Sequence, residues 1–358
     1  MNKDLHGGNI YKFQREGKND ILDYSSNINP LGVPQKFIDI AKESFDKLVN
    51  YPDPYYIELR KKIAEFNSLD MDNIIVGNGA TEILFLYMRA LKPKKVLILA
   101  PCFAEYERAL KSVSANIEYF ELRESDNFYP NIINLKKEIK NNNYDLLLFC
   151  NPNNPTGQFI KLEDIKEIIE NCENKNTKIF IDEAFIEFIE NWKEKTVSLL
   201  KNRNIFIMRA FTKFFAIPGL RLGYGIGFDD EILKKMWEEK EPWTVNTFAN
   251  LAGLIMLDDK EYIEKTEKWI LEEKKFMYKE LSKFQNIKVY KTECNFILIK
   301  LSNTSSASLR DKMMEKNVLI RDASNFKFLD YHFVRVAIKD RKSNLKMLET
   351  LAEFVEYK

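Results

Sequence analysis

The segment FTKFFAIPGLRLG, residues 211–223, comes just after the apolar run Ile205–Arg209, which has the length and composition of a buried strand. Lys213 therefore lies just past a strand and among aromatic residues, where an ammonium group is poorly solvated. Poor solvation favours the neutral amine, which is the nucleophilic form of lysine. Arg221, in a turn flanked by glycines, offers a guanidinium fork that suits a phosphate dianion. The segment predicts a nucleophilic lysine beside a phosphate site.

The chain on the N-terminal side of this segment alternates short apolar runs with amphipathic stretches. Val96–Ala100, Asp145–Cys150 and Lys178–Asp182 are typical of buried strands, and Lys161–Asn171 has the apolar spacing of a helix. This alternation predicts a mostly parallel sheet that is covered on both faces. In such sheets ligands bind beyond the carboxyl ends of the strands. Polar clusters follow the predicted strands at Asn78-Gly79, Asn151–Gly157, Asp182-Glu183 and Thr212-Lys213.

The pattern changes after Trp243. A long charged amphipathic helix is predicted over Glu261–Phe284, and strand-like segments follow at Ile287–Leu301, Val318–Arg321 and Phe333–Ile338. We therefore expect an α/β protein with two domains. The large domain, residues 48–245, holds the mostly parallel sheet. Residues 1–47 and 246–358 form a smaller α+β domain, in which the N-terminal segment acts as a lid.

Composition excludes several classes of partner. The 55 Lys and Arg residues against 54 Asp and Glu give a net charge of +1, which recruits neither nucleic acid nor an anionic membrane. No apolar run is long enough to span a bilayer, and the polar N-terminus does not resemble a signal peptide. The four cysteines are far apart, and with two histidines they predict neither disulfides nor a metal site. We expect a cytoplasmic protein with reduced thiols.

Three further features accompany Lys213. Asp182 ends a predicted buried strand, where a carboxylate is costly unless it has a cationic partner such as a protonated pyridine nitrogen. Residues 76–82, VGNGATE, place small residues between a strand and a helix, where backbone N–H groups can hold a phosphate. That segment lacks the lysine and the glycine spacing of nucleotide-binding loops. Taken alone, Asn151–Gly157 is typical of a rigid turn.

The motifs NPNNPTG at residues 151–157, DEA at 182–184 and TKFFAIPGLRLG at 212–223, in this order, resemble those of the fold-type I enzymes that use pyridoxal 5′-phosphate (PLP). The resemblance covers essentially the whole chain. It implies that Lys213 binds the cofactor as a Schiff base, that Asp182 pairs with the ring nitrogen, that Asn154 contacts the ring hydroxyl and that Phe103 stacks on the ring. It assigns the cofactor phosphate to Ala80, Thr81, Thr212 and Arg221, and to Tyr51 from the other subunit of a homodimer.

A finer resemblance concerns the substrate. The segments HGGN at residues 6–9, SNINPLG at 26–32, PCFAEY at 101–106 and PWTVN at 242–246, together with Phe185 after the DEA motif, resemble the L-threonine-O-3-phosphate decarboxylase family of cobalamin biosynthesis. This resemblance implies a small phosphorylated amino acid as substrate and (R)-1-aminopropan-2-yl phosphate as product. The residues that it assigns to the substrate are His6, Gly7, Asn29, Arg321 and Arg335, and without it the two arginines could equally be structural.

Two other functions remain open at this stage. Histidinol-phosphate aminotransferases, or related aminotransferases, share the same cofactor motifs, because decarboxylation and transamination differ only in which bond at Cα is presented to the ring. A transcription regulator with this fold is disfavoured, since the chain has no winged-helix segment and no basic patch.

Overall fold

The computed structural model describes residues 6–356, and its core is a seven-stranded sheet with the order β2-β8-β7-β6-β5-β3-β4. β8 is antiparallel to both of its neighbours, and the remaining pairs are parallel. The expected mostly parallel sheet is confirmed. Its strands are β2 (Ile74–Asn78), β3 (Lys95–Ala100), β4 (Asn116–Glu121), β5 (Leu146–Cys150), β6 (Lys178–Asp182), β7 (Ile205–Ala210) and β8 (Leu222–Gly227).

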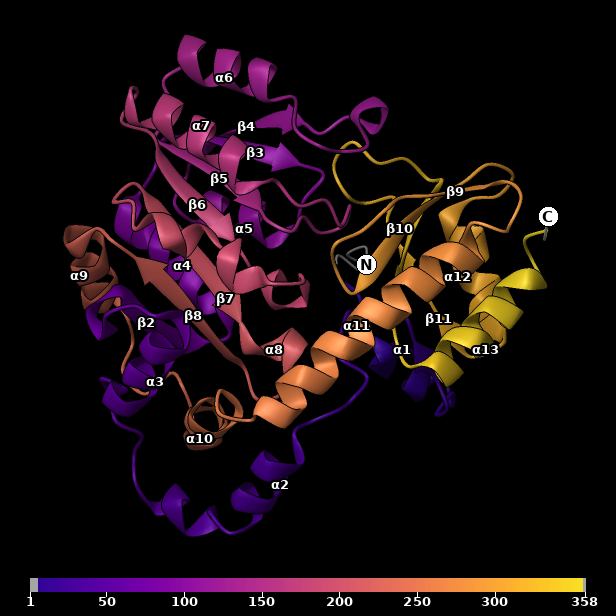
Figure 1. Cartoon of the computed structure of the whole chain (residues 1–358), viewed down its shortest axis with the longest axis horizontal. Helices are drawn as coiled ribbons and strands as arrows, with labels where there is room; N and C mark the ends of the chain where they lie inside the picture. Colours follow the sequence, from indigo (N-terminus) through magenta and orange to yellow (C-terminus); the bar gives the residue numbers. More distant parts are fainter. Residues whose placement is uncertain (1–5, 357–358) are drawn as a thin grey trace.

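Helices cover both faces of this sheet (Figure 1). Alternate residues of one strand point to opposite faces, so that Leu97 and Leu99 of β3 enter one core while Val96 and Ile98 enter the other. The first core also receives α3 (Ile57–Asn67), α6 (Ile132–Asn141), α7 (Leu162–Glu173) and α10 (Thr247–Met256); the second receives α4 (Ala80–Leu91), α5 (Glu105–Ser112) and α9 (Asp230–Glu239). Burial on both faces explains why these strands are continuous apolar runs.

The C-terminal part forms a second layer of sheet and helices. A four-stranded sheet has the order β12-β13-β10-β9 within the described residues, and β1 pairs with β11 in a separate parallel ladder. The strands are β1 (Leu22–Asp23), β9 (Ile287–Val289), β10 (Phe296–Leu301), β11 (Val318–Leu319), β12 (Arg321–Asp322) and β13 (Phe333–Ala337). The helices that complete the fold are α1 (Ile10–Arg15), α2 (Gln35–Lys42), α8 (Phe211–Phe214), α11 (Lys260–Leu281), α12 (Ser306–Glu315) and α13 (Arg341–Ala352).

Helix α11 runs from the region of α10 toward α12 and α13 (Figure 1). It starts where the side chain of Asp259 accepts a hydrogen bond from the backbone N–H of Tyr262, a cap that sequence periodicity alone did not locate. The predicted strand Val318–Arg321 is corrected by the structure. It breaks at Ile320, so that Val318–Leu319 joins β1 while Arg321 joins β13.

The sheet order explains how distant residues meet. Cys150 is paired with Asp182, and Asp182 with Met208, so the carboxyl ends of β5, β6 and β7 lie at one edge of the sheet. Within residues 6–356, no helix combines the length and the apolar character that a membrane crossing requires.

Candidate active site

A cavity of about 490 Å³ opens at this edge, between the large sheet and the C-terminal sheet. Twelve of the fourteen residues predicted to bind cofactor or substrate line it: His6, Gly7, Ala80, Thr81, Phe103, Asn154, Asp182, Thr212, Lys213, Arg221, Arg321 and Arg335. They come from the N-terminal segment, from the loops after β2, β3, β5, β6 and β7, and from β12 and β13.

Lys213 lies on the single turn α8 that follows β7. Phe211, Phe214 and Phe215 around it are buried, with exposed fractions of 2–3%. Burial lowers the pKa of Lys213 to about 8, and the positive charges of Arg335 and Arg221 act in the same direction. The amine is therefore much closer to its nucleophilic form at neutral pH than an exposed lysine would be.

Asp182 ends β6 and is 4% exposed. Its Oδ1 accepts a hydrogen bond from the backbone N–H of Ala184 at 2.9 Å, and its Oδ2 accepts one from the hydroxyl of Tyr106 at 2.5 Å. Burial raises the pKa of this carboxyl to about 6. Within residues 6–356 Asp182 forms no ion pair, although the charge of Lys213 lowers the pKa of its carboxyl somewhat. A buried carboxylate that lines a cavity without a cationic partner fits the protonated ring nitrogen of PLP.

The start of α4 forms another wall of the cavity. Its N-cap, Gly79, has φ +78° and no side-chain oxygen, so the first N–H groups of the helix are available to an anion. A Cβ on Gly79 would lie 2.5 Å from Nη2 of Arg221, and one on Gly223 would lie 2.2 Å from the backbone nitrogen of Ala80. Only glycines let Arg221 and the helix come this close. This pocket of N–H groups with one guanidinium fits the cofactor phosphate.

Arg335 enters the cavity from β13 and is 5% exposed. Its Nη1 donates to Oδ1 of Asn154 at 2.5 Å, and its Nη2 donates to the backbone oxygen of Ser25 at 2.8 Å. Its Nε has no hydrogen-bond partner, and within residues 6–356 its two hydrogen bonds go to an amide oxygen and a backbone oxygen, not to a carboxylate. Burial lowers its pKa to about 9, and the charge of Arg321 adds to this effect. Such a buried cation fits an anionic group of a ligand.

Arg321 lies beside Arg335, because the two residues are partners in the antiparallel ladder of β12 and β13. The side chain of Arg321 is 6% exposed and donates to the backbone oxygen of Asp322 and to Oδ1 of Asn325, each at 2.8 Å. Two guanidinium groups on neighbouring strands give this wall a concentrated positive charge.

The N-terminal segment closes the cavity over Phe103. Nε2 of His6 lies 2.9 Å from Oε1 of Glu105, and the His6 and Phe103 rings are 5.4 Å apart. A Cβ on Gly7 would lie 2.0 Å from the backbone oxygen of Ser25, so a glycine is required for this approach. Met1 to Leu5, the first part of the predicted lid, lie outside the described residues.

Two predicted residues do not line the cavity. Tyr51 is 81% exposed, and its ring packs against that of Trp243 at 4.9 Å. Asn29 is 2% exposed, and its amide nitrogen donates to the backbone oxygen of Phe214 and to the hydroxyl of Thr266. Its backbone N–H also donates to the backbone oxygen of Lys213. Asn29 thus supports the turn that carries Lys213 and does not line the cavity, and its contact with a substrate stays a prediction.

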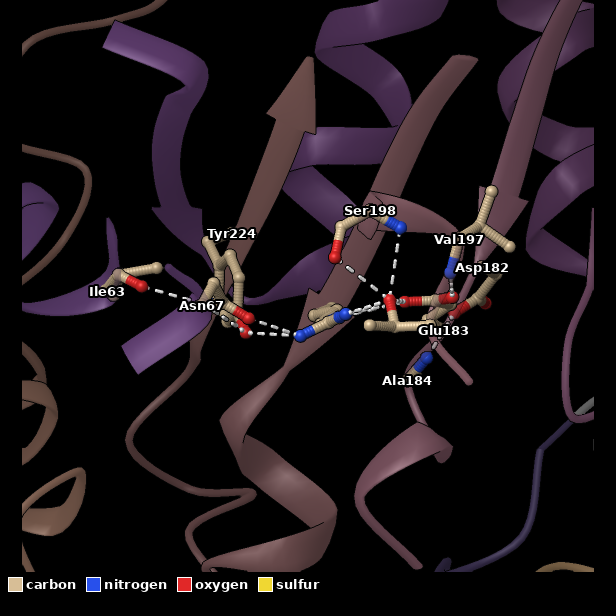
Figure 2. Close-up of polar contacts among 10 residues, drawn as sticks. Ile63, Asn67, Asp182, Glu183, Ala184, Val197, Ser198 and Tyr224 are labelled. Carbon is tan, nitrogen blue, oxygen red and sulfur yellow. Dashed lines mark hydrogen bonds and ion pairs between the residues drawn. The ribbon is translucent and has the colours of Figure 1, made fainter. Parts of the chain in front are cut away.

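A buried polar network lies next to Asp182 (Figure 2). Glu183 and Arg209 are fully buried and form an ion pair, with Nη2 at 2.7 Å and Nε at 3.0 Å from Oε2. The other oxygen of Glu183 accepts from the backbone N–H of Val197, and Nη1 of Arg209 donates to Asn67. The network ties the end of β6, which carries Asp182, to the end of β7, which leads to Lys213.

Sequence reasoning missed some residues of the wall. Ser25, Arg108 and Cys150 also line the cavity. Arg108 has the pattern of an ordinary exposed helix position, and Ser25 contributes a backbone oxygen, which no side-chain motif reveals. Only the three-dimensional fold identifies them.

Known proteins resemble the chain over nearly its full length. The family described as "Aminotransferase class I and II" matches residues 19–351. The threonine-phosphate decarboxylase of Salmonella typhimurium is 34% identical over 97% of this chain and 95% of its own length. A protein of Caldanaerobacter subterraneus subsp. tengcongensis, to which the same activity is provisionally assigned, is 43% identical over 98% of this chain and 94% of its own.

Among solved structures, the histidinol-phosphate aminotransferase of Clostridium acetobutylicum is 38% identical and superposes with a TM-score of 0.86, covering 92% of this chain and 98% of that one. The fold expected from the motifs is thereby confirmed. With a family match over residues 19–351 and a cavity whose charged groups fit PLP, the chain belongs to the class I and II aminotransferase family and is a PLP-dependent enzyme.

Proposed function

We propose that this enzyme decarboxylates L-threonine O-3-phosphate to (R)-1-aminopropan-2-yl phosphate, a step of cobalamin biosynthesis. The observation that carries the proposal is the pair of neighbouring buried arginines, Arg321 and Arg335, in a cavity that His6 also lines. A substrate with both a phosphate and a carboxylate suits this pair, because an anionic group can accept a hydrogen bond from the unpartnered Nε of the buried Arg335. The full-length similarity to threonine-phosphate decarboxylases supports this substrate.

Within the proposal, the large sheet holds the cofactor. Lys213 attaches it covalently, Asp182 pairs with the ring nitrogen, and Phe103 packs on the ring. Oδ1 of Asn154 is engaged by Arg335, which leaves its amide nitrogen free to donate to the ring hydroxyl. The phosphate group is held by Ala80, Thr81, Thr212 and Arg221, which line one end of the cavity.

When bound, PLP supplies the electron sink for the bond broken at the substrate Cα. The protein decides which bond breaks by orienting the substrate. In our proposal Arg321 and His6 bind the substrate phosphate, and Arg335 binds the anionic groups near Cα. The carboxylate would leave as CO₂, and Nζ of Lys213, released when the substrate amine takes its place, would then deliver a proton to Cα. The close packing of Gly7 on the backbone of Ser25 holds the N-terminal segment against this side of the cavity.

We also propose a homodimer in which Tyr51 reaches the cofactor phosphate of the other subunit. A group of exposed apolar side chains supports this assembly, because such groups are typical of interaction sites. It comprises Phe45, Leu48, Val49, Tyr51, Tyr55 and Trp243, with exposed fractions of 46–86%.

The division into a large domain of residues 48–245 and a small domain of residues 1–47 and 246–358 remains a proposal as well.

A second candidate is transamination of histidinol phosphate, favoured by the similarity to the Clostridium acetobutylicum structure. Product analysis separates the two. Purified enzyme with PLP and L-threonine O-3-phosphate should release CO₂ without any 2-oxo acid, whereas transamination requires one. Rapid turnover of histidinol phosphate with 2-oxoglutarate, and no CO₂ from threonine phosphate, would replace the first proposal by the second.

The role of His6 is tested in the same assay. His6→Ala should raise KM for threonine phosphate and leave PLP affinity unchanged, because the proposal assigns this cavity-lining imidazole to the substrate phosphate. His332→Ala is the matched control, since this second histidine pairs with Asp330 outside the cavity. Equal effects of the two substitutions would remove His6 from the substrate site.

A further inference from the structure

Tyr106, which none of the assigned roles includes, makes the shortest hydrogen bond to Asp182. Its side chain belongs to the first turn of α5 and is fully buried behind the wall of the cavity. The hydroxyl donates to Oδ2 of Asp182 at 2.5 Å, while Oδ1 accepts from the backbone N–H of Ala184 at 2.9 Å. Each carboxylate oxygen therefore has a fixed donor, and the group is held in one orientation within the cavity.

The tyrosine can act only as a donor in this contact. Burial raises the pKa of Tyr106 well above its usual value, and the charge of Asp182 raises it further, so the hydroxyl stays protonated. A hydrogen bond donated to a carboxylate favours its ionised form. Burial has the opposite effect on Asp182, and it brings the pKa of the carboxyl to about 6. The bond from Tyr106 thus opposes protonation of Asp182 just where burial promotes it.

Tyr106 also contacts Phe103, the residue that is expected to stack on the cofactor ring. The rings of Phe103 and Tyr106 pack edge to face with centroids 5.7 Å apart. Phe103 lines the cavity and Tyr106 lies behind it, so this turn positions both a face of the ring site and the carboxylate at its end.

We propose that Tyr106 is a positioning residue that keeps Asp182 ionised and aimed at the ring nitrogen of PLP. Tyr106 also contacts Cys150 and the Phe103 ring, but in the proposal its effect on PLP binding passes through the Asp182 carboxylate. The inference rests on the placement of the cofactor ring against Asp182, and it holds for decarboxylation and transamination alike.

The test removes one oxygen atom. Tyr106→Phe should weaken the affinity of the cofactor-free protein for PLP by about 10- to 100-fold, the range for loss of one hydrogen bond to a charged group. The pH midpoint of PLP binding should also move upward, because Asp182 then loses its proton only at higher pH. Both quantities follow from the visible absorbance of bound cofactor in titrations at several pH values.

Tyr87→Phe is the matched control. Tyr87 is 2% exposed in the same core and stacks on Phe206 at 4.5 Å, away from Asp182. Its loss of a hydroxyl should change neither PLP affinity nor the pH midpoint. An unchanged midpoint in Tyr106→Phe would overturn the proposal, and so would equal changes in both variants.

A second comparison separates positioning from packing. In an Asp182→Asn background, Tyr106→Phe should add little further loss of PLP affinity, because the charged acceptor is already gone. A full additional loss in that background would show that Tyr106 acts independently of Asp182 and would contradict the inference. If Asp182→Asn alone left PLP affinity unchanged, the assignment of the ring site itself would fail. The product assay with threonine phosphate tests the reaction separately.

Discussion

Lys213 and Asp182 share one cavity, and burial displaces their pKa values toward each other, to about 8 and about 6. In each case burial disfavours the charged form. For the lysine this produces a nucleophile near neutral pH. For the aspartate it creates a group that a positively charged ring nitrogen would stabilise in its ionised form.

At the residue scale the pH dependence of cofactor binding follows. The carboxyl of Asp182 is ionised above its pKa of about 6 and neutral below it. Only the ionised form can pair with a protonated ring nitrogen, so PLP affinity should fall as pH decreases through about 6. Asp182→Asn should abolish this part of the pH dependence and lower kcat by about 10²- to 10³-fold. Near-normal turnover of that variant, measured at saturating PLP, would contradict the role of Asp182.

Sequence alone could predict these two residues because their chemistry depends on position relative to a strand end. Lys213 and Asp182 follow apolar runs, and parallel strands bring such ends together. The contacts of Asn29 and Tyr106 could not be predicted in this way. Both depend on which way a side chain points after helices and loops have packed, and no local pattern encodes that direction.

At the scale of elements, the Glu183–Arg209 pair joins β6 to β7 beneath the cavity. Both side chains are fully buried, so loss of one charge leaves the other without a partner in a dry environment. The ion pair adds a side-chain link between the residue after Asp182 and the strand that leads to Lys213.

Glu183→Gln should therefore lower the free energy of unfolding by about 3–5 kcal/mol. The matched control is Glu167→Gln, which removes the same charge from the half-exposed pair with Lys136 and should cost at most about 1 kcal/mol. Urea unfolding followed by tryptophan fluorescence gives both values. Similar losses for the two variants would mean that burial adds nothing to the strength of the Glu183–Arg209 pair.

The boundaries of some strands could be predicted from sequence better than those of others. The buried strands of the large sheet have uninterrupted apolar sequences, and β6 was located to the residue. The segment 318–321 was read as one strand, since nothing in VLIR marks the break at Ile320. The break arises because residues 318–319 pair with β1 and residues 321–322 pair with β13. Which strands lie beside the segment is decided by the tertiary fold.

For the whole molecule, the exposed apolar group around Tyr51 predicts a dimer with a mass of about twice 42.3 kDa in sedimentation experiments. If Tyr51 crosses to the partner's cofactor phosphate, Tyr51→Phe should weaken PLP binding while the dimer persists. Co-expression of Tyr51→Phe with Lys213→Ala tests the crossing, because a mixed dimer contains one site with both native residues. Recovery of activity in mixed dimers is expected. A fully active monomer would refute the shared site.

The opposed arginines of β12 and β13 have a thermodynamic consequence. Like charges directly across an antiparallel ladder repel each other, and the charge of Arg321 helps to lower the pKa of Arg335 in the folded chain. A ligand that neutralises them relieves this repulsion, and its binding free energy is added to the stability of the fold. If the proposed anionic substrate binds at Arg335, it should raise the melting temperature of the enzyme in proportion to the logarithm of its concentration above Kd.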